Sequence, residues 1–302
     1  TYGVKMPRVG TETMTSLLVP IPPLEEQRRI VEKIDKVASA VSAYDVAYQK
    51  TETLSSAFPE RLKKSILQEA VQGKLVPQDP SDEPAEALLE RIRAEKQRLI
   101  KEGKIKKDKH ESVIFRRDNS HYEKLDGVEC CIDDELLFEI PENWCWVRFG
   151  TAITLLSGTD FAPDEYNSAG KGIAYITGAS NIVDSQILVN RWTETPRQIT
   201  HAGDILLVCK GSGYGKTVIC NIKQAHIARQ IMAVQKCNLL DMQYIKLFLD
   251  SSFDLLKTKG QGVIPGIDRT SVLHLLFPLP PLNEQHRIVQ RIEELLPLVK
   301  GL

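Results

Sequence analysis

The stretch Pro20-Ile-Pro-Pro-Leu-Glu-Glu-Gln-Arg-Arg-Ile-Val, or PIPPLEEQRRIV, recurs near the other end of the chain as PLPPLNEQHRIV, which begins at Pro278. The two copies align without a gap, and the match extends upstream, where Leu17-Leu18 corresponds to Leu275-Leu276. The identical residues of the first copy are Pro20, Pro22, Pro23, Leu24, Glu26, Gln27, Arg29, Ile30, Val31 and Ile34. Because the period is far longer than that of a solenoid repeat, we interpret the repeated unit as a whole module with one junction at each end.

Length and composition bound the class of protein. The chain has 302 residues, of which 42% are hydrophobic, enough for one large domain or two modest ones. It contains neither an apolar run long enough to cross a membrane nor an export signal, so we expect a cytoplasmic protein. The absence of a starting Met suggests a processed or excerpted chain. The net charge of −1 argues against a general polyanion binder, although a local basic face remains compatible with it.

The cysteines do not predict a metal site. The six are Cys130, Cys131, Cys145, Cys209, Cys220 and Cys237. None forms a CxxC pair, and adjacent thiols such as Cys130 and Cys131 are poorly placed to supply two ligands to one tetrahedral ion. We therefore expect reduced, mostly packed thiols and no bound metal.

After Pro23 the sequence predicts a long helix. Its apolar or permissive residues alternate spacings of four and three, which gives the 3.5-residue period of a coiled-coil seam. The seam residues are Ile30, Ile34, Val37, Val41, Tyr44 and Tyr48, continued by Thr51, Ser55, Phe58 and Leu62. Such a seam requires a partner helix, and a coiled-coil spacer fits it better than a helix packed on its own domain. Pro59 predicts a kink or a restart.

The rest of the chain predicts an α+β protein in which a mixed, β-rich domain is joined to spacer helices. Residues 1–20 read as the tail of a preceding, missing domain, 21–70 as the central spacer helix, and 71–140 as a connector. The connector should contain a helix at about 84–102, capped by Ser81 or Asp82, and then a solvated, lysine-rich linker. Residues 141–278 should form the β-rich domain, and 279–302 the start of a distal spacer helix.

The glycine-rich stretch Lys210-Gly-Ser-Gly-Tyr-Gly-Lys-Thr is not a nucleotide-binding P-loop, because that motif requires glycine where Lys210 stands. The histidines form no HExxH or similar pair, and no adenosyl-binding loop or amino-methyltransferase tetrapeptide is present. These observations point away from catalysis and from a cofactor. The loop is either an ordinary hairpin or a segment that places amides and cations against a nucleic acid.

Candidate DNA-binding residues are chosen by side-chain chemistry and loop position. Lys and Arg bind phosphate or guanine edges, while Asn and Gln hydrogen-bond adenine. The residues selected are Lys171, Asn181, Lys210, Ser212, Tyr214, Lys216, Arg229 and Gln230. Further local charge comes from Arg191, Arg197, Lys257 and Lys259, and Gln198 is another plausible base reader. For each of them a solvated side chain is the alternative.

Several motifs, taken in order, resemble the specificity subunit of Type I restriction-modification enzymes. They are the two PxPPLxEQxRIV junctions, Gly73-Lys-Leu-Val-Pro-Gln-Asp-Pro with Glu83-Pro, Leu88-Leu-Glu-Arg-Ile-Arg, Ile140-Pro-Glu-Asn-Trp-Cys-Trp-Val-Arg, and Gly203-Asp-Ile-Leu-Leu-Val-Cys-Lys-Gly-Ser-Gly. The resemblance covers nearly the whole chain.

The resemblance implies a protein with two target-recognition domains, each reading half of a split DNA sequence, held apart by two antiparallel helices. Methyltransferase subunits that carry S-adenosylmethionine dock on this scaffold, separate motor subunits cleave DNA, and the specificity subunit catalyses nothing. This chain has only the end of a first recognition domain. We therefore hypothesise that two copies pair their helices. The alternative is a coiled-coil protein scaffold that does not bind DNA.

Overall fold

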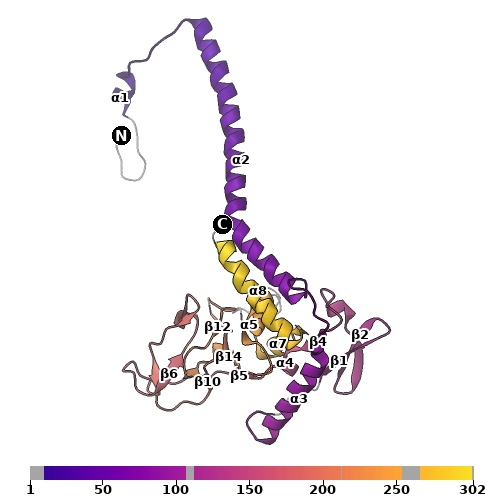
Figure 1. Ribbon diagram of the computed structural model, residues 1–302. Coiled ribbons are helices and arrows are strands. Elements are labelled where there is room, and N and C mark those ends of the chain that lie inside the picture. Colours follow the sequence, from indigo (N-terminus) through magenta and orange to yellow (C-terminus); the bar gives the residue numbers. More distant parts are fainter. Residues whose placement is uncertain (1–9, 107–111, 212, 254–265, 301–302) are drawn as a thin grey trace. The chain divides into compact units, whose positions relative to one another are not determined.

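The computed structural model describes residues 10–106, 112–211, 213–253 and 266–300 (Figure 1). The chain divides into two compact units, Thr1–Phe58 and Pro59–Leu302. In the first unit, a short helix α1 (Thr11–Thr15) precedes the long helix α2 (Leu24–Val71), which continues into the second unit. The six residues from Ile30 to Tyr48 that were assigned to the seam are all exposed, and the rings of Tyr44 and Tyr48 stack at 6.1 Å. An apolar stripe of this length on one helix is a surface that requires a partner.

Helix α2 continues through Pro59, so of the predicted kink or restart only the restart is wrong. Proline removes one helical hydrogen bond and crowds the preceding turn, at a cost of about 3 kcal/mol. The last turns of the helix offset this cost, because Leu67, Ala70 and Val71 are buried in the main hydrophobic core of the second unit.

The connector contains more structure than the sequence suggests. Helix α3 (Ala85–Lys101) lies within the predicted range, but its N-cap is Pro84 and no side chain caps it. A three-stranded antiparallel meander, β1 (Ser112–Arg117), β2 (Ser120–Leu125) and β3 (Val128–Cys131), follows in the connector, where the sequence predicts only a helix and a linker. Arg148 anchors this sheet to the next domain through an ion pair with Glu123 of β2, and it also pairs with Glu135 in the turn that follows β3.

The remaining elements form a layered domain. One four-stranded sheet has the order β12-β11-β14-β5 and a second has the order β10-β13-β6-β9, with β15-β4 and β7-β8 as two-stranded pairs. The strands are β4 (Cys145–Arg148), β5 (Leu155–Ser157), β6 (Ile173–Ile176), β7 (Ile182–Val183), β8 (Gln186–Ile187), β9 (Trp192–Thr193), β10 (Ile199–His201), β11 (Ile205–Val208), β12 (Thr217–Ile219), β13 (Gln224–Ile227), β14 (Ile231–Val234) and β15 (Leu276–Leu279). The helices are α4 (Phe149–Ala152), α5 (Met242–Ser251), α7 (Arg269–Leu273) and α8 (Leu282–Lys300).

Strands β11 and β14 are buried on both faces, which explains their uninterrupted apolar sequences. Ile205 and Leu207 point into the main core, which also contains buried residues of α2, α3, α5 and α8. Leu206 and Val208 point the other way, into a second core shared with β6 and β13. Because side chains alternate along a strand, one sheet lies between a helical layer and the other sheet.

The repeated junction has the same local structure in both copies. In the first, Gln27 Nε2 donates to the carbonyl of Pro22 at 2.7 Å; in the second, Gln285 Nε2 donates to the carbonyl of Pro280 at 3.0 Å. Helix α1 is likewise the repeat equivalent of α7. In both copies the glutamine side-chain amide therefore donates to a backbone carbonyl that lies just before the helix. This carbonyl takes no part in the regular hydrogen bonds of the helix.

The surroundings of the two copies differ. The carboxylate of Glu284 is buried and accepts hydrogen bonds from Trp144 Nε1 at 2.9 Å and from Gln78 Nε2 at 2.6 Å. Arg287 donates to Asp82 at 2.6 Å, and Asp82 does not cap α3. The repeat equivalent of Glu284 is Glu26, which is exposed.

We expect Glu284→Ala to lower the free energy of unfolding by about 2 kcal/mol, because Trp144 and Gln78 lose a charged acceptor at a buried site. Glu26→Ala is the matched control and should change it by less than about 0.5 kcal/mol. Urea denaturation of both variants tests this. Equal losses would show that the contacts of Glu284 do not stabilise the domain.

Candidate nucleic-acid interface

Several loops meet at one edge of the layered domain. Strands β6 and β13 are parallel, with Ile176 beside Ile227, so the segments that follow them lie together. Strand β11 ends where β14 begins, with Val208 opposite Ile231. The loop after β5 joins this edge because Gly158 N donates to the Ile231 carbonyl at 3.1 Å. We call these segments the loop edge; they are residues 157–161, 177–181, 197–198, 209–211, 213–216 and 228–230.

The glycine-rich loop is held compactly at this edge. Gly215 has a φ of +89°, and its amide donates to the Val208 carbonyl at 2.7 Å. A Cβ on Gly215 would stand 1.7 Å from the ring of Phe253, and one on Gly213 would stand 2.3 Å from the Cβ of Ala179. These contacts are possible only for glycine, so the loop packs tightly on its neighbours.

Four predicted residues lie together in this arrangement. Lys210, Lys216, Arg229 and Gln230 are exposed at the loop edge. The Gln230 side chain lies over the loop that follows β6, since a Cβ on Gly178 would be 2.7 Å from its Oε1. Three cations and one amide on a shared edge can bind a phosphate backbone and a base edge together.

The remaining predicted residues have other positions. Tyr214 is partly buried, and its ring meets Phe253 edge to face at 5.7 Å against the main core, which leaves it poorly placed to stack on a base. Lys171 precedes β6 and therefore lies at the end of that strand opposite the loop edge. Ser212 lies outside the described residues.

Asn181 is a correction to the predicted set, because it is buried and its amide is fully engaged. Its Oδ1 accepts from the backbone and hydroxyl of Thr177 at 2.9 and 3.0 Å, and its Nδ2 donates to Leu188 O and Asn190 Oδ1 at 2.8 and 3.2 Å. Asn181 holds the loop between β6 and β9 in shape and does not reach a ligand.

Sequence reasoning missed a buried histidine beneath the loop edge. His226 Nδ1 accepts from the backbone N–H of Arg197 and Gln198 at 3.3 and 3.1 Å, so Nε2 carries the proton and donates to the Thr159 carbonyl at 2.7 Å. Burial lowers the pKa of His226 below its usual range, because it penalises the charged imidazolium. The neutral ring joins two loops of the edge. An isolated histidine in sequence gives no sign of this.

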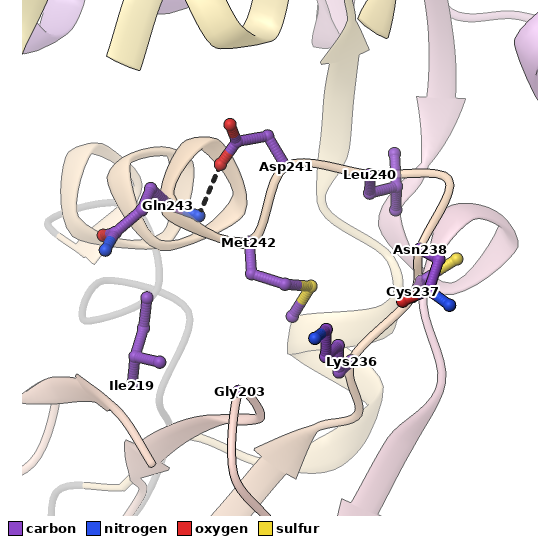
Figure 2. Close-up of a pocket in the computed structure, with 9 residues that line it drawn as sticks. All are labelled: Gly203, Ile219, Lys236, Cys237, Asn238, Leu240, Asp241, Met242 and Gln243. Carbon is purple, nitrogen blue, oxygen red and sulfur yellow. Dashed lines mark hydrogen bonds between the residues drawn. The ribbon is translucent and has the colours of Figure 1, made fainter. Parts of the chain in front are cut away.

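One cavity lies away from this edge. It has a volume of about 410 Å³ and lies near Gly203, Lys236 and the start of α5, at the opposite end of β11 and β14 (Figure 2). There Asp241 caps α5 by accepting from Gln243 N at 2.8 Å. The lining offers no convergent set of catalytic groups.

The described part of the chain contains no cluster of three His, Cys, Asp or Glu side chains that could hold a metal ion. Burial raises the pKa of Cys145 and Cys209 to about 12, so both thiols stay protonated at neutral pH. Within the same described ranges, no helix is long and apolar enough to cross a membrane.

Comparison with known proteins assigns the family. Residues 1–43 and 155–299 match the family described as "Type I restriction modification DNA specificity domain", and these ranges cover more than half of the chain and the whole of the loop edge. The chain belongs to this family. The stretch from 44 to 154, which contains most of α2, α3 and the β1–β3 sheet, lies outside the family match.

Two specificity-subunit relatives and one solved structure illustrate the likeness. The Type I restriction enzyme EcoAI specificity subunit of Escherichia coli is 29% identical over 92% of this chain and 53% of its own length. The EcoEI specificity subunit of the same organism is 30% identical over 89% of this chain and 45% of its length. The chain thus spans about half the length of these relatives. A chain from a structure of the type I R-M system has the same fold, with a TM-score of 0.55 and 21% identity over 99% of this chain and 58% of that one.

We predict that lowering the pH destabilises this specificity domain through His226. The lowered pKa means that the unfolded chain takes up a proton near the ordinary value of about 6.5 while the folded ring does not. Stability should therefore be fully present above about pH 6.5 and fall as the pH drops below that value. Ring titration by NMR should give a midpoint for His226 below 6.5; a midpoint at or above it would contradict the assignment.

Proposed function

We propose that this chain is a non-catalytic, cytoplasmic DNA-specificity module of a Type I restriction-modification system. Its layered domain reads half of a bipartite target through the loop edge. The observation that carries the proposal is the convergence of Lys210, Lys216, Arg229 and Gln230 on one exposed edge, in a chain of the DNA specificity family. Lys171 is a separate candidate, for a contact at the other end of β6.

The partners that we propose are double-stranded DNA, methyltransferase subunits and, through them, motor subunits with endonuclease activity. The exposed seam of α2 supports a scaffold role, because an apolar stripe on a helix is covered by another helix or by a partner protein. The methyltransferase subunits, and not this chain, carry S-adenosylmethionine in this proposal.

The decisive experiment is selection from a random duplex library at near-physiological salt, with and without an added methyltransferase subunit. An enriched short motif, or two copies of it at fixed spacing, supports a DNA reader. No enrichment in either arm, with the complex verified by gel filtration, would favour a protein-binding scaffold.

Two kinds of substitution should separate phosphate contacts from base contacts. Lys210→Ala with Lys216→Ala should weaken binding to every sequence. It should also reduce the magnitude of the slope of log K against log[salt] by about 2, because binding releases about one counterion fewer for each phosphate contact that is lost. Gln230→Ala should instead relax one position of the motif by roughly 1–3 kcal/mol. Lys74→Ala with Lys124→Ala, outside the loop edge, controls for net charge. An unchanged affinity and salt slope in the first variant would exclude the loop.

We also propose that two copies pair through α2. At micromolar concentration, light scattering should give twice the chain mass of 33.9 kDa. Ile34→Glu with Val41→Glu should yield monomers, because buried charges oppose seam packing. Lys36→Glu with Ser39→Glu, on the other face of the helix, should remain dimeric. A monomeric wild-type chain would contradict this pairing.

A further inference from the structure

One short segment after β5 contacts two arginines at the loop edge. Asp160 pairs with Arg229, and Glu165 pairs with Arg197. Between these carboxylates, Phe161 places its ring 5.1 Å from the Arg197 guanidinium. Exposed ion pairs contribute about 0–1 kcal/mol each to stability, so folding alone gives little reason for two of them on one segment. The arrangement fixes where two guanidinium groups lie.

Arg229 is held at its base and is open at its tip. Asp160 Oδ1 accepts the backbone N–H of Arg229 at 2.9 Å, and Oδ2 lies 3.2 Å from Nε. In the described contacts the two terminal nitrogens have no partner, and the side chain is 71% exposed. A guanidinium with its Nε occupied still presents two parallel N–H donors outward.

Arg197 is held from three sides. Its backbone N–H donates to His226 Nδ1 at 3.3 Å, its Nη2 pairs with Glu165, and its guanidinium lies over Phe161. The Phe161 ring is fixed in turn, because it lies 4.1 Å from the buried ring of His226 and meets Tyr175 edge to face at 5.2 Å. The side chain of Arg197 nevertheless remains 52% exposed, so a ligand can reach it.

The two arginines share one edge of the sheet. Ile227 N donates to the Gln198 carbonyl at 3.1 Å, which places the segment of Arg197 beside the end of β13. Arg229 and Gln230 follow directly after that strand. Arg197, Arg229 and Gln230 are thus presented from neighbouring segments.

The neighbouring carboxylates favour binding of these arginines to a base edge over binding to a phosphate. Asp160 and Glu165 offset the positive charge and repel an approaching phosphate, so they weaken a phosphate grip. The edge of guanine carries no net charge and offers two acceptors, O6 and N7, to a planar pair of donors. Recognition of that edge gains from fixed orientation, because less side-chain freedom is lost on binding.

We propose that Arg197 and Arg229 each read a guanine in the major groove, and that residues 159–165 are the positioning segment that holds them. The inference rests on the proposed DNA-binding function and deepens it. It adds Arg197 to the base-reading residues and gives Asp160, Phe161 and Glu165 the role of aligning the guanidinium groups.

The experiment measures binding of the full chain, with the methyltransferase subunit added, to the selected duplex, to duplexes with each G·C pair replaced, and to an unrelated duplex. Arg197→Lys and Arg229→Lys keep the charge but lose the planar fork. Each should lose about 10-fold or more of the preference for guanine at one position. Affinity for the unrelated duplex should change less than about 2-fold, because the charge is kept.

Removal of the carboxylates provides the opposite test. Asp160→Asn and Glu165→Gln each remove one negative charge, so affinity for the unrelated duplex should rise. The preference for guanine should fall at the same position that the lysine variant affects, because the guanidinium is no longer aligned. If the arginines gripped phosphate, affinity for all duplexes would rise and the preference would stay unchanged. Since each position is tested by both an arginine and a carboxylate variant, one that fails to fold leaves the other informative.

The chain offers a matched control on the β1–β3 sheet. Arg117 pairs with Glu129 at 3.2 Å, is 50% exposed, and lies 4.3 Å from the ring centre of Tyr122. Arg117→Lys and Glu129→Gln make the same chemical changes away from the loop edge and should leave the motif unchanged. A wild-type chain that selects no motif would overturn the proposed function. A wild-type chain with a motif that all four edge variants retain would overturn only the guanine assignment.

Discussion

The buried carboxylate of Glu284 is the contact on which the arrangement of the second unit depends. It accepts hydrogen bonds from Trp144 at the start of the layered domain and from Gln78 in the connector. Glu284 itself lies in the first turn of α8, the helix that follows β15. Strand β15 pairs with β4, so the first and last strands of the domain lie side by side. A charge removed from water requires this full set of partners, because an unpaired buried carboxylate would cost several kcal/mol. The carboxylate therefore links three segments that are distant in sequence.

The position of the candidate interface follows from the same packing. Helices α2, α3, α5 and α8 contribute to the core on one face of the β12-β11-β14-β5 sheet, and the other face lies against the second sheet. With both faces buried, polar loops are displaced to the strand ends. The register of β6 with β13 and of β11 with β14 then selects which loops share an edge. In the proposed function, the base-reading side chains are precise because a rigid, two-sided sheet supports them.

Sequence patterns predicted the features that depend on local chemistry. The apolar runs of β11 and β14 and the helix from Ala85 to Lys101 lie where the patterns placed them. The β1–β3 meander was missed because its strands carry charges and are only partly buried; the two-residue turns Asp118-Asn119 and Asp126-Gly127, with positive φ at each residue, were the available signal.

Individual site residues were harder to predict, because exposure depends on distant segments. Nothing near Asn181 in sequence indicates that Leu188 and Asn190 will enclose it. Tyr214 lies in a loop rich in glycine, yet its ring packs against Phe253. The exposure of the lysines and of Arg229 was easier to predict from sequence, because charged side chains are seldom buried without a partner. The carboxylates that align the arginines became visible only in three dimensions.

The two copies of the junction separate local from long-range effects within one molecule. Gln27 and Gln285 make the same hydrogen bond in different surroundings, so this feature of the helix start follows the local PxPPLxEQ sequence. Glu26 and Glu284 are identical in sequence but differ in burial, because Trp144 and Gln78 approach only the second copy. The motif therefore has two independent parts, a glutamine that starts a helix and a carboxylate that fixes this helix to a domain. In the proposed function the second part joins the base-reading loops to a spacer helix as one rigid body, so that loop residues set the half-site and helix length sets the spacing.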